Sequence, residues 1–515
     1  MKPIKLMSGF MTVGFWTLAS RVLGFMREIL IAAYIGPGVL GDAFYAAFRL
    51  PNMFRRFFAE GAFNAAFVPM FAKRWEAGEN PQGFAQDAFN LLAASVLLLT
   101  ALGMVFMPAL VLLTAGGFDG DARFDLTVGY GRIVFPYILC MSLAALFSGV
   151  LNATGRFAAA AAAPVLLNIL ACAAMIAGAL LGQEVIDWLV WVIPFAGIAQ
   201  LALVWSAAAR AGISLRPGLP RLTPEMKQLV RVALPAALAM GVTQVNLVVG
   251  QAVASSYAGA VSWLSLADRL YQLPLGVVGI AVGIVLLPDL SRRLRAGDDQ
   301  GAQDALSRAG EFSLLLTIPS AVAFIAIPLP LVSVLYERGA TGPQDTTAIA
   351  MAVAIYGAGL PAFVLQKVLQ PLYFAREDTR SPFHYALVAM VVNAVLAVGL
   401  QPVFGWLAPA IAAPVAGWVM VLQLWLGARR MGAAAQFDAR FQRRSLRIVL
   451  ASIAMGGVLF AAAALLGPAL ATAYWRYLAL LALIVIGAVA YFAIGQIIGA
   501  FRLSEFRSAL RRGKA

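Results

Sequence analysis

The sequence has few charged side chains and almost no histidine or cysteine. Of its 515 residues, 12% are charged, whereas about 25% is usual in soluble proteins, and 62% are hydrophobic. The available polar surface cannot cover a core this apolar, so a water-soluble globular fold is excluded. Together with a mean hydropathy of +0.85, this composition predicts an all-α integral membrane protein.

The scarcity of histidine and cysteine also excludes several kinds of site. His384 is the only histidine, and Cys140 and Cys172 both lie inside apolar stretches. A metal site built from His and Cys needs more ligands than these, and two cysteines in apolar stretches do not make a disulfide framework. We therefore predict no metal site and no cofactor, and we expect both cysteines to act as small packing residues.

Long apolar runs are what the sequence has instead. A bilayer core of ~30 Å needs about 20 apolar residues per helix. Runs of this kind predict fourteen transmembrane helices, at 9–35, 41–72, 84–115, 126–152, 158–182, 186–209, 228–256, 259–290, 309–336, 345–374, 383–402, 406–428, 447–468 and 475–500. Pro51, Pro136 and Pro361 lie within these spans and predict kinks. The first run follows Lys2 and Lys5 but lacks a small-residue cleavage site, so we interpret it as a retained span and not a signal peptide.

The net charge of +14 does not indicate nucleic-acid binding, because the basic residues are spread between the apolar runs. Sorted by predicted side, most of the 38 Lys and Arg residues fall on one face of the membrane. The opposite face has only Arg123, Arg132, Arg338 and Arg476. Cytoplasmic loops carry the excess of basic residues, so we predict an inner-membrane protein with both termini in the cytoplasm.

An internal repeat divides the predicted helices. Phe48-Arg49-Leu50 with a later Pro69 resembles Asp268-Arg269-Leu270 with a later Pro288, and Pro136 with Asn168 matches Pro361 with Asn393 at the same spacing. This pattern predicts two pseudo-symmetric six-helix lobes plus two C-terminal helices. The domains would be 1–211 (N-terminal lobe), 212–227 (cytoplasmic linker), 228–430 (C-terminal lobe), 431–446 (second linker) and 447–515 (last two helices and a basic tail). Transporters of this design move one repeat against the other around a site near the membrane midplane.

Charged residues inside the predicted spans are the candidate site. An arginine at mid-bilayer costs about 2.5–3.5 kcal/mol if it faces lipid, so these side chains must be paired or must face water. Apart from Arg231, which lies near a helix start and is expected to reach the cytoplasmic interface, the basic ones are Arg21, Arg27, Arg49, Arg55, Arg56, Arg269 and Lys367, and the acidic ones are Glu28, Asp42, Glu60 and Asp268. They could be ion pairs that hold the helices together. The surplus of guanidinium groups favours a hydrated cavity that binds phosphate oxygens.

Several motifs that carry these residues resemble the lipid II flippases (the MurJ/MviN family), and the resemblance covers nearly the whole chain. They are Ser20-Arg21-Val22-Leu23-Gly24-Phe25 with Arg27-Glu28, Asp42-Ala43-Phe44, Phe48-Arg49-Leu50-Pro51-Asn52 with Arg55-Arg56 and Glu60, Ser262-Trp263 with Asp268-Arg269-Leu270, and Lys367-Val368-Leu369 with Arg376, Asp378 and Pro382. The family belongs to the multidrug/oligosaccharidyl-lipid/polysaccharide (MOP) exporter superfamily.

The resemblance implies a transporter, not an enzyme, that moves undecaprenyl-pyrophosphate-linked peptidoglycan precursor (lipid II) to the periplasmic leaflet of a bacterial inner membrane by alternating access. It implies that Arg21, Arg27, Arg55 and Arg269 bind the pyrophosphate in a central cavity. Glu28, Asp42, Arg49, Arg56, Glu60 and Asp268 would be cavity or gate charges, and Asn52, Ser262, Gln272 and Lys367 further cavity residues. The last two helices would hold the lipid tail.

The resemblance leaves other points open. Gln272 stands where some members have a glutamate, and Gly250-Gln251 replace a carboxylate-bearing pair, which puts a shared sodium site in doubt. Coupling to the membrane potential or to a monovalent ion is undecided. We expect a monomer surrounded by membrane lipids, and association with the cell-wall synthesis machinery is a second open point. Alternatives are a flippase for another lipid-linked oligosaccharide, a MATE-like drug exporter, which would need a net acidic cavity, and a membrane enzyme, which would need a catalytic cluster in its loops.

Overall fold

The computed structural model describes the backbone of residues 3–55 and 62–501, and within these ranges the regular elements are all helices. Side chains are described there as well, except at 3–11, 62, 65, 235–243 and 277–285. The predicted all-α class is therefore confirmed. Arg56 and Glu60, two of the predicted gate charges, lie outside the described residues.

The chain forms two compact units. Unit 1 comprises Met1–Ser262 together with Arg338–Thr341, and unit 2 comprises Trp263–Glu337 and Gly342–Ala515. The short segment Arg338–Thr341 thus belongs to unit 1, although the residues on both sides of it belong to unit 2.

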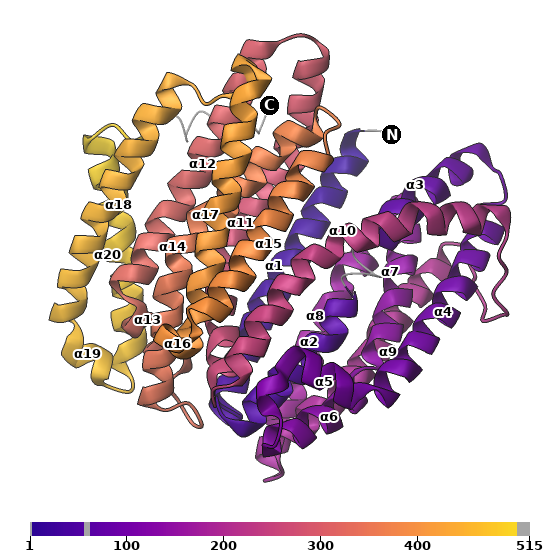
Figure 1. Cartoon of the computed structure of the whole chain (residues 1–515), viewed down its shortest axis with the longest axis horizontal. Coiled ribbons are helices and arrows are strands. Elements are labelled where there is room, and N and C mark those ends of the chain that lie inside the picture. The colour runs from indigo at the N-terminus through magenta and orange to yellow at the C-terminus, as the bar shows by residue number, and fades with distance from the viewer. Residues whose placement is uncertain (1–2, 56–61, 502–515) are drawn as a thin grey trace. The chain divides into compact units, whose positions relative to one another are not determined.

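Unit 1 is a bundle of long helices, drawn in indigo to magenta in Figure 1. Its described helices are α1 (Pro3–Tyr34), α2 (Val39–Arg55), α3 (Ala62–Ala77), α4 (Pro81–Val105), α5 (Met107–Ala115), η2 (Gly116–Phe118), α6 (Ala122–Val134), α7 (Tyr137–Ala153), α8 (Ala158–Leu180), α9 (Val185–Arg210) and α10 (Pro224–Ser255). One part of its core lies where α1, α2, α7, α8 and α9 pack together, around Ile31, Phe44, Tyr137, Met175 and Ile193.

Unit 2 contains most of α11 and the helices that follow it (Figure 1). These are α11 (Ala260–Arg295), α12 (Asp299–Ala326), α13 (Pro328–Tyr336), α14 (Pro343–Phe374), α15 (Arg380–Gly399), α16 (Gln401–Phe404), η3 (Gly405–Leu407), α17 (Ala408–Ala428), η4 (Arg429–Met431), η5 (Ala433–Ala435), α18 (Ala439–Leu465), α19 (Gly467–Ala471) and α20 (Trp475–Ile497). A core cluster that includes Leu286, Leu306, Val368 and Leu424 joins α11, α12, α14 and α17.

Ten helical stretches in the described part of the chain are long and apolar enough to cross a membrane. The four other predicted spans, 9–35, 41–72, 228–256 and 259–290, fall on α1, on α2 with α3, on α10 and on α11, and each of them includes residues outside the described side chains. The number fourteen stays a prediction, whereas the multi-pass character is established.

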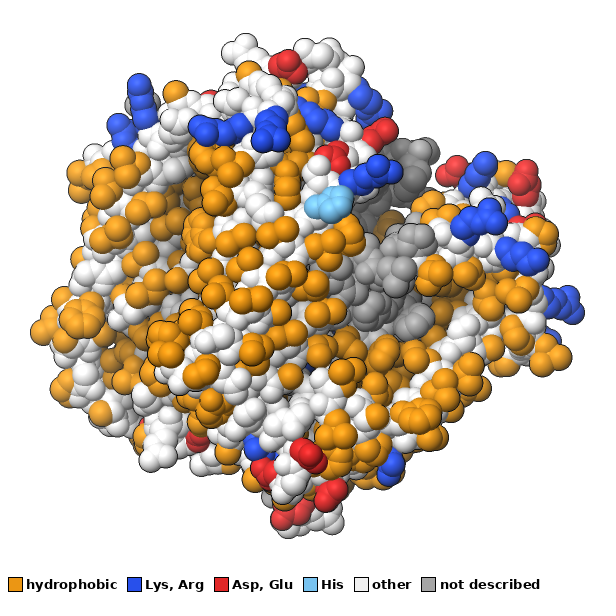
Figure 2. Space-filling model, in the orientation of Figure 1, with side chains coloured by type: hydrophobic (Ala, Val, Ile, Leu, Met, Phe, Trp, Pro, Cys, Tyr) orange, Lys and Arg blue, Asp and Glu red, His pale blue; other side chains and the backbone are white. Residues whose placement is uncertain are grey.

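Large apolar side chains are exposed along these helices. Leu180, Phe460 and Leu465 have 82%, 69% and 83% of their surface exposed, which water would make unfavourable and lipid favours. In Figure 2, hydrophobic side chains cover unit 2 between its ends, and Lys and Arg side chains gather at one end. This arrangement is the one expected of a bundle surrounded by lipid, with its basic loops on one side of the membrane.

Prolines divide three of the predicted spans into two helices each. Span 84–115 is α4 and α5, 126–152 is α6 and α7, and 309–336 is α12 and α13. Pro108, Pro136 and Pro328 lie at the starts of the second helices, where a missing N–H costs nothing. Pro51 and Pro361, by contrast, lie inside continuous helices. Of the three breaks, the sequence predicted only the one at Pro136.

The predicted linker 212–227 is bound to α4. The backbone N–H and C=O of Arg216 pair with the side-chain amide of Gln86, at 2.9 and 2.5 Å, and the Gln82 amide donates to the carbonyl of Ser214. Ile213 and Leu215 are buried. Helix α10, which the repeat counts in the C-terminal lobe, packs in unit 1. The lobe boundaries therefore stay a prediction.

A polar network joins α18 to α12 in unit 2. Glu311 on α12 is 7% exposed and pairs with Arg308, with Arg444 at 3.3 Å and with Arg440 at 3.5 Å. Asp438 pairs with Arg308 and also accepts a hydrogen bond from the backbone N–H of Phe441, which caps α18. This network fixes the start of the last long helices to the preceding bundle.

Candidate functional site

Two of the predicted site residues of α1, Arg27 and Glu28, form a polar cluster with two neighbouring helices. Arg27 donates through Nη2 to Glu28 Oε1 at 2.8 Å, and Tyr45 on α2 donates its hydroxyl to Glu28 Oε2 at 2.8 Å. Arg27 Nη1 donates to Asn168 Oδ1 on α8 at 3.1 Å. We call Arg27, Glu28, Tyr45 and Asn168 the Arg27 cluster. It joins α1, α2 and α8 at a depth where unpaired charges would be costly.

Most side chains of the Arg27 cluster are buried, so their contacts also contribute to the stability of the fold. Arg27, Glu28 and Asn168 are 7%, 2% and 6% exposed. Phe48 lies with its ring 5.8 Å from the Arg27 guanidinium carbon, a cation–π contact. In this conformation Arg27 is therefore paired with an acid, as the ion-pair alternative requires, and two of its five N–H donors are in use.

Arg21 lies nearly two turns before Arg27 on α1 and has a different environment. Its Nε is buried and has no hydrogen-bond partner among the described residues. Buried polar atoms are nearly always satisfied, so an orphaned guanidinium nitrogen indicates a group that water or an anion contacts. This makes Arg21 a candidate for the phosphate-binding role that the resemblance implies for it.

Asp42 is the centre of a second cluster. Its side chain is fully buried and accepts four hydrogen bonds, from Gly259 N at 2.7 Å, Ser262 N at 2.9 Å, Ser262 Oγ at 2.8 Å and Arg123 Nη1 at 3.3 Å. Gly259 and Ser262 stand at the N-terminus of α11, where backbone N–H groups lack helical partners. We call Asp42, Arg123, Gly259 and Ser262 the Asp42 cluster. Its carboxylate caps α11 from another helix.

Arg123, on the predicted outer face, completes that cluster. Besides Asp42, it contacts Asp121 Oδ2 at 2.6 Å and the carbonyl of Tyr257 at 3.3 Å, and its guanidinium lies 4.5 Å from the Phe118 ring centre. The backbone N–H and side chain of Arg123 lower the pKa of Asp121, which stands before α6. Asp121 therefore stays ionised and helps to hold Arg123 in place.

The segment Arg338–Thr341 contacts the C-terminal end of α1. Ala340 N donates to the carbonyl of Ala33 at 2.8 Å, and Thr341 Oγ1 donates to that of Ala32 at 2.6 Å. Gly36, with φ +68°, leaves room for this segment, because a Cβ there would lie 2.4 Å from the carbonyl oxygen of Ala340. Ala340 and Thr341 are thus held against the end of α1 by hydrogen bonds.

The other predicted site residues are distributed over both units. Arg49, Asn52 and Arg55 are partly buried on α2, where Asn52 donates to the carbonyl of Phe48 at 2.9 Å. Arg269 and Asp268 lie on the part of α11 that belongs to unit 2, and Gln272 donates to Asp268 one turn away. Lys367 is exposed on α14. Ser262 is brought to Asp42, and Glu28 to Arg27, whereas Arg269 belongs to unit 2 and Arg21, Arg27 and Arg55 belong to unit 1.

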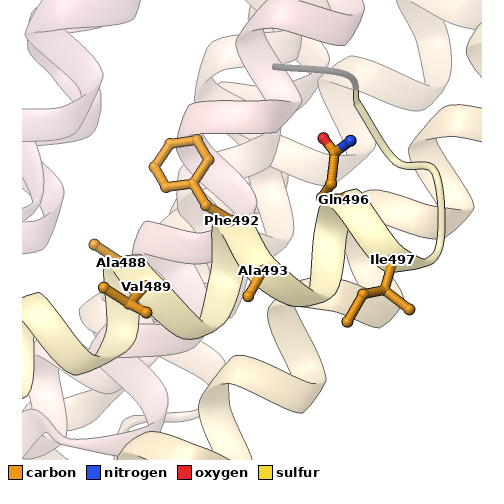
Figure 3. A pocket seen from close by; sticks show the side chains of 6 residues that line it. All are labelled: Ala488, Val489, Phe492, Ala493, Gln496 and Ile497. Carbon is orange, nitrogen blue, oxygen red and sulfur yellow. The ribbon is translucent and has the colours of Figure 1, made fainter. Parts of the chain in front are cut away.

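A shallow apolar pocket of about 570 Å³ lies on α20. Figure 3 shows its lining side chains projecting from this helix, and they are Ala488, Val489, Phe492, Ala493, Gln496 and Ile497. Gln496 is the only polar residue that lines the pocket, so its surface suits a lipid chain. It lies in the helix pair that the sequence assigned to the lipid tail.

Sequence reasoning did not select Asn168, Tyr45 or Arg123 as site residues. Asn168 had a signal, because it repeats as Asn393 at the same spacing after a proline. Arg123 had a weaker one, as one of the rare basic residues on the predicted outer face. Tyr45 had none, since a tyrosine in an apolar run is usually a packing residue.

Comparison with known protein families gives one match over most of the chain. The family profile described as "Lipid II flippase MurJ" matches residues 31–486. A protein of Rhizobium tropici described as a probable lipid II flippase MurJ is 44% identical over 99% of this chain and 97% of its own length. The lipid II flippase MurJ of Burkholderia cenocepacia is 33% identical over 88% of this chain and 90% of its own.

Solved structures agree with the sequence comparison. A lipid II flippase MurJ in an inward closed conformation superimposes with a TM-score of 0.79 at 26% identity, over 94% of this chain and 98% of that one. An inward-facing MATE multidrug transporter of the MOP superfamily gives a TM-score of 0.65 at 15% identity, over 82% of this chain and 96% of that one, which shows a shared fold.

Proposed function

Because the chain belongs to the MurJ family of lipid II flippases, we propose that it moves lipid II from the cytoplasmic to the periplasmic leaflet of the inner membrane. It is a multi-pass membrane transporter of the MOP superfamily and not an enzyme. The family assignment leaves the route and the residues to be identified. For these we rely on the chemistry of the side chains within each unit.

The pyrophosphate of the substrate is bound by Arg21, Arg27, Arg55 and Arg269. The observation that carries this assignment is the buried Arg21 Nε without a hydrogen-bond partner in the described residues. Pyrophosphate oxygens accept hydrogen bonds from guanidinium groups in a bidentate manner, which makes them the natural partners of such a nitrogen. In this proposal the four arginines line a central basic cavity, and their positive charge repels cationic drugs.

The Asp42 cluster closes the outer end of unit 1 during alternating access. Its carboxylate joins α2, the start of α6 and the start of α11 in this conformation. Opening toward the periplasm requires at least some of these bonds to break. A buried carboxylate is stable only when its donors are present. The outer end of unit 1 is therefore expected to be either fully closed, with all these bonds made, or open.

The membrane potential favours outward movement of the anionic headgroup. With the cell interior negative, each net negative charge that moves outward gains ~2.3 kcal/mol per 100 mV. The pocket on α20, with five apolar lining residues and Gln496, takes part of the polyprenyl tail, which stays in the bilayer. Both termini lie in the cytoplasm, and the protein acts as a monomer in this scheme.

Complementation tests the arginine assignment. In a strain depleted of its own lipid II flippase, the wild-type chain restores growth, and Arg21→Ala and Arg269→Ala fail to do so at equal membrane levels. Leaflet exchange of labelled lipid II by the purified variants falls by about tenfold or more, since each loses a charge-assisted contact. Arg210→Ala is the control, because Arg210 is exposed at the end of α9 and bonds Ser206 one turn away on the same helix.

Two results would contradict the proposal in different ways. Normal growth with both variants at normal expression would remove Arg21 and Arg269 from the binding site. Failure of the wild-type chain to prevent lysis, together with exchange of a different lipid-linked oligosaccharide, would replace the substrate and keep the transport function.

A further inference from the structure

The Arg27 cluster contains a neutral residue whose contacts indicate a specific task. We propose that Asn168 is a positioning residue that holds the Arg27 guanidinium in place for the pyrophosphate of the transported lipid. This inference rests on the proposed function, because it requires Arg27 to bind the anionic headgroup. Asn168 itself does not touch the substrate in this scheme.

The first argument is that Arg27 is held from two sides. Nη2 bonds Glu28 on its own helix at 2.8 Å, and Nη1 bonds Asn168 on α8 at 3.1 Å. Without Asn168, the guanidinium keeps only the hydrogen bond to its neighbour in sequence, Glu28, and the ring contact with Phe48. An arginine side chain has several rotatable bonds, and fixing it in advance lowers the entropy that anion binding must overcome.

The second argument is that Asn168 is fixed at its other end. Its Nδ2 donates to the carbonyl of Ser20 at 3.0 Å, and Ser20 lies two turns before Arg27 on the same face of α1. Gly24 lies between them, and a Cβ at that position would stand 3.5 Å from Asn168 Nδ2. The amide therefore accepts from Arg27 through its oxygen and donates to the α1 backbone through its nitrogen, so both of its polar atoms are in use.

The third argument concerns charge. Glu28 already neutralises one positive charge of the cluster, and Tyr45 holds Glu28 by a 2.8 Å hydrogen bond. A carboxylate at position 168 would restrain Arg27 equally well but would make the cluster net negative and repel pyrophosphate. A neutral amide restrains the guanidinium without competing for it, which is the property that an anion-binding site needs.

A double-mutant cycle tests the inference on the full-length purified protein. Binding of undecaprenyl pyrophosphate is measured for the wild type, Arg27→Ala, Asn168→Ala and the double variant. We expect Asn168→Ala to weaken binding about tenfold, because it loses one hydrogen bond to a charged group. In the Arg27→Ala background the same change should have no further effect, since Asn168 acts only through Arg27.

The matched control is Asn393→Ala, because Asn393 is 5% exposed and follows Pro361 at the spacing by which Asn168 follows Pro136. It should leave binding within about twofold of wild type, whereas a general effect of removing a buried asparagine would appear in both variants. If Asn168→Ala does not yield folded protein, Asn168→Ser is used in the same cycle, with the same expectation.

The outcomes separate this inference from the proposed function. Equal losses from the position-168 change in the wild-type and Arg27→Ala backgrounds would make Asn168 a structural residue and overturn the inference alone. Undiminished binding by Arg27→Ala would overturn the inference and remove Arg27 from the proposed pyrophosphate site, because Arg27 would then not contact the anion, whereas the proposed transport of lipid II would stand. Wild-type affinity of Asn168→Ala beside a weakened Arg27→Ala would again overturn only the positioning role.

Discussion

At the scale of single residues, the fully buried Asp42 carboxylate depends on the groups that bond it. All the groups that surround its carboxylate are donors: two backbone N–H groups, the Ser262 hydroxyl and the Arg123 guanidinium. An isosteric amide would turn an NH₂ toward at least one of these donors. Shape alone would be preserved and the hydrogen-bond pattern would not.

Asp42→Asn should therefore lower the stability of the folded protein by roughly 2–4 kcal/mol, because a buried, paired charge is replaced by a mismatched dipole. Thermal unfolding of the purified variant in detergent measures this as a lower midpoint. Asp119→Asn is the control, since Asp119 is exposed in the neighbouring turn. Equal midpoints for Asp42→Asn and the wild type would mean that the cluster does not hold the outer end.

At the scale of helices, the junction of α12 and α18 decides how firmly the last helices are attached. Glu311 is the only acid that joins Arg308, Arg440 and Arg444 among the described residues. Its loss leaves three guanidinium groups close together. The stacked rings of Phe437 and Phe441 pack against Gly310, so the apolar part of the junction would remain.

Glu311→Gln should loosen the first turns of α18 without unfolding the bundle. We expect a cost of about 1–3 kcal/mol, reduced because Arg308 and Arg440 are partly exposed to solvent. Hydrogen–deuterium exchange of residues 439–447 should become faster, with exchange in α14 unchanged. Asp304→Asn, at an exposed position of α12, should change neither, and an unaltered α18 in Glu311→Gln would show that the apolar contacts suffice.

The positions of the helices were predictable from the sequence, because they follow from its apolar composition. The contacts between the helices and their connecting segments were not predictable. Apolar runs located the helices because lipid requires internal backbone hydrogen bonds. The breaks at Pro108 and Pro328 were missed, since a proline at a helix start and one inside a helix look alike in sequence. The docking of 212–223 on α4 was missed because it depends on Gln86, a polar residue that composition assigns to no partner.

In the candidate site, the charged residues were predictable from the sequence and their partners were not. Charge at membrane depth identified Arg21, Arg27, Glu28 and Asp42, because each has a large solvation cost that demands an explanation. Their partners could not be identified in this way. Asn168 and Tyr45 are neutral, and the Gly259 amide that bonds Asp42 belongs to the backbone, which no sequence pattern marks.

At the scale of the whole molecule, the orientation in the membrane is open to a direct test. The basic residues predict that the linker after α9 lies in the cytoplasm and that the turn before α20 lies in the periplasm. Leu219 and Tyr474 mark these segments, with 86% and 88% of their surface exposed.

In a background with Cys140 and Cys172 replaced by alanine, Tyr474→Cys should react with a membrane-impermeant maleimide in intact spheroplasts. Leu219→Cys should react only after the membrane is permeabilised. The positive-inside asymmetry is the physical reason, and labelling is read by a mass shift on a gel. The reverse pattern would invert the predicted topology, and labelling of both sites from outside would invalidate the count of spans between them.

The residues of the Asp42 cluster are far apart in the sequence, so they are synthesised at different times. Arg123 follows Asp42 by 81 residues, and the α11 amides follow by 217 and 220. At translation rates of about 5–20 residues per second, the carboxylate spends roughly ten to forty seconds in the nascent chain before its last donors emerge. Until then Asp42 lacks its donors from Gly259 and Ser262, and the insertion machinery must keep it in a polar environment. The outer end of unit 1 can reach its final structure only after the ribosome has translated the first half of the chain.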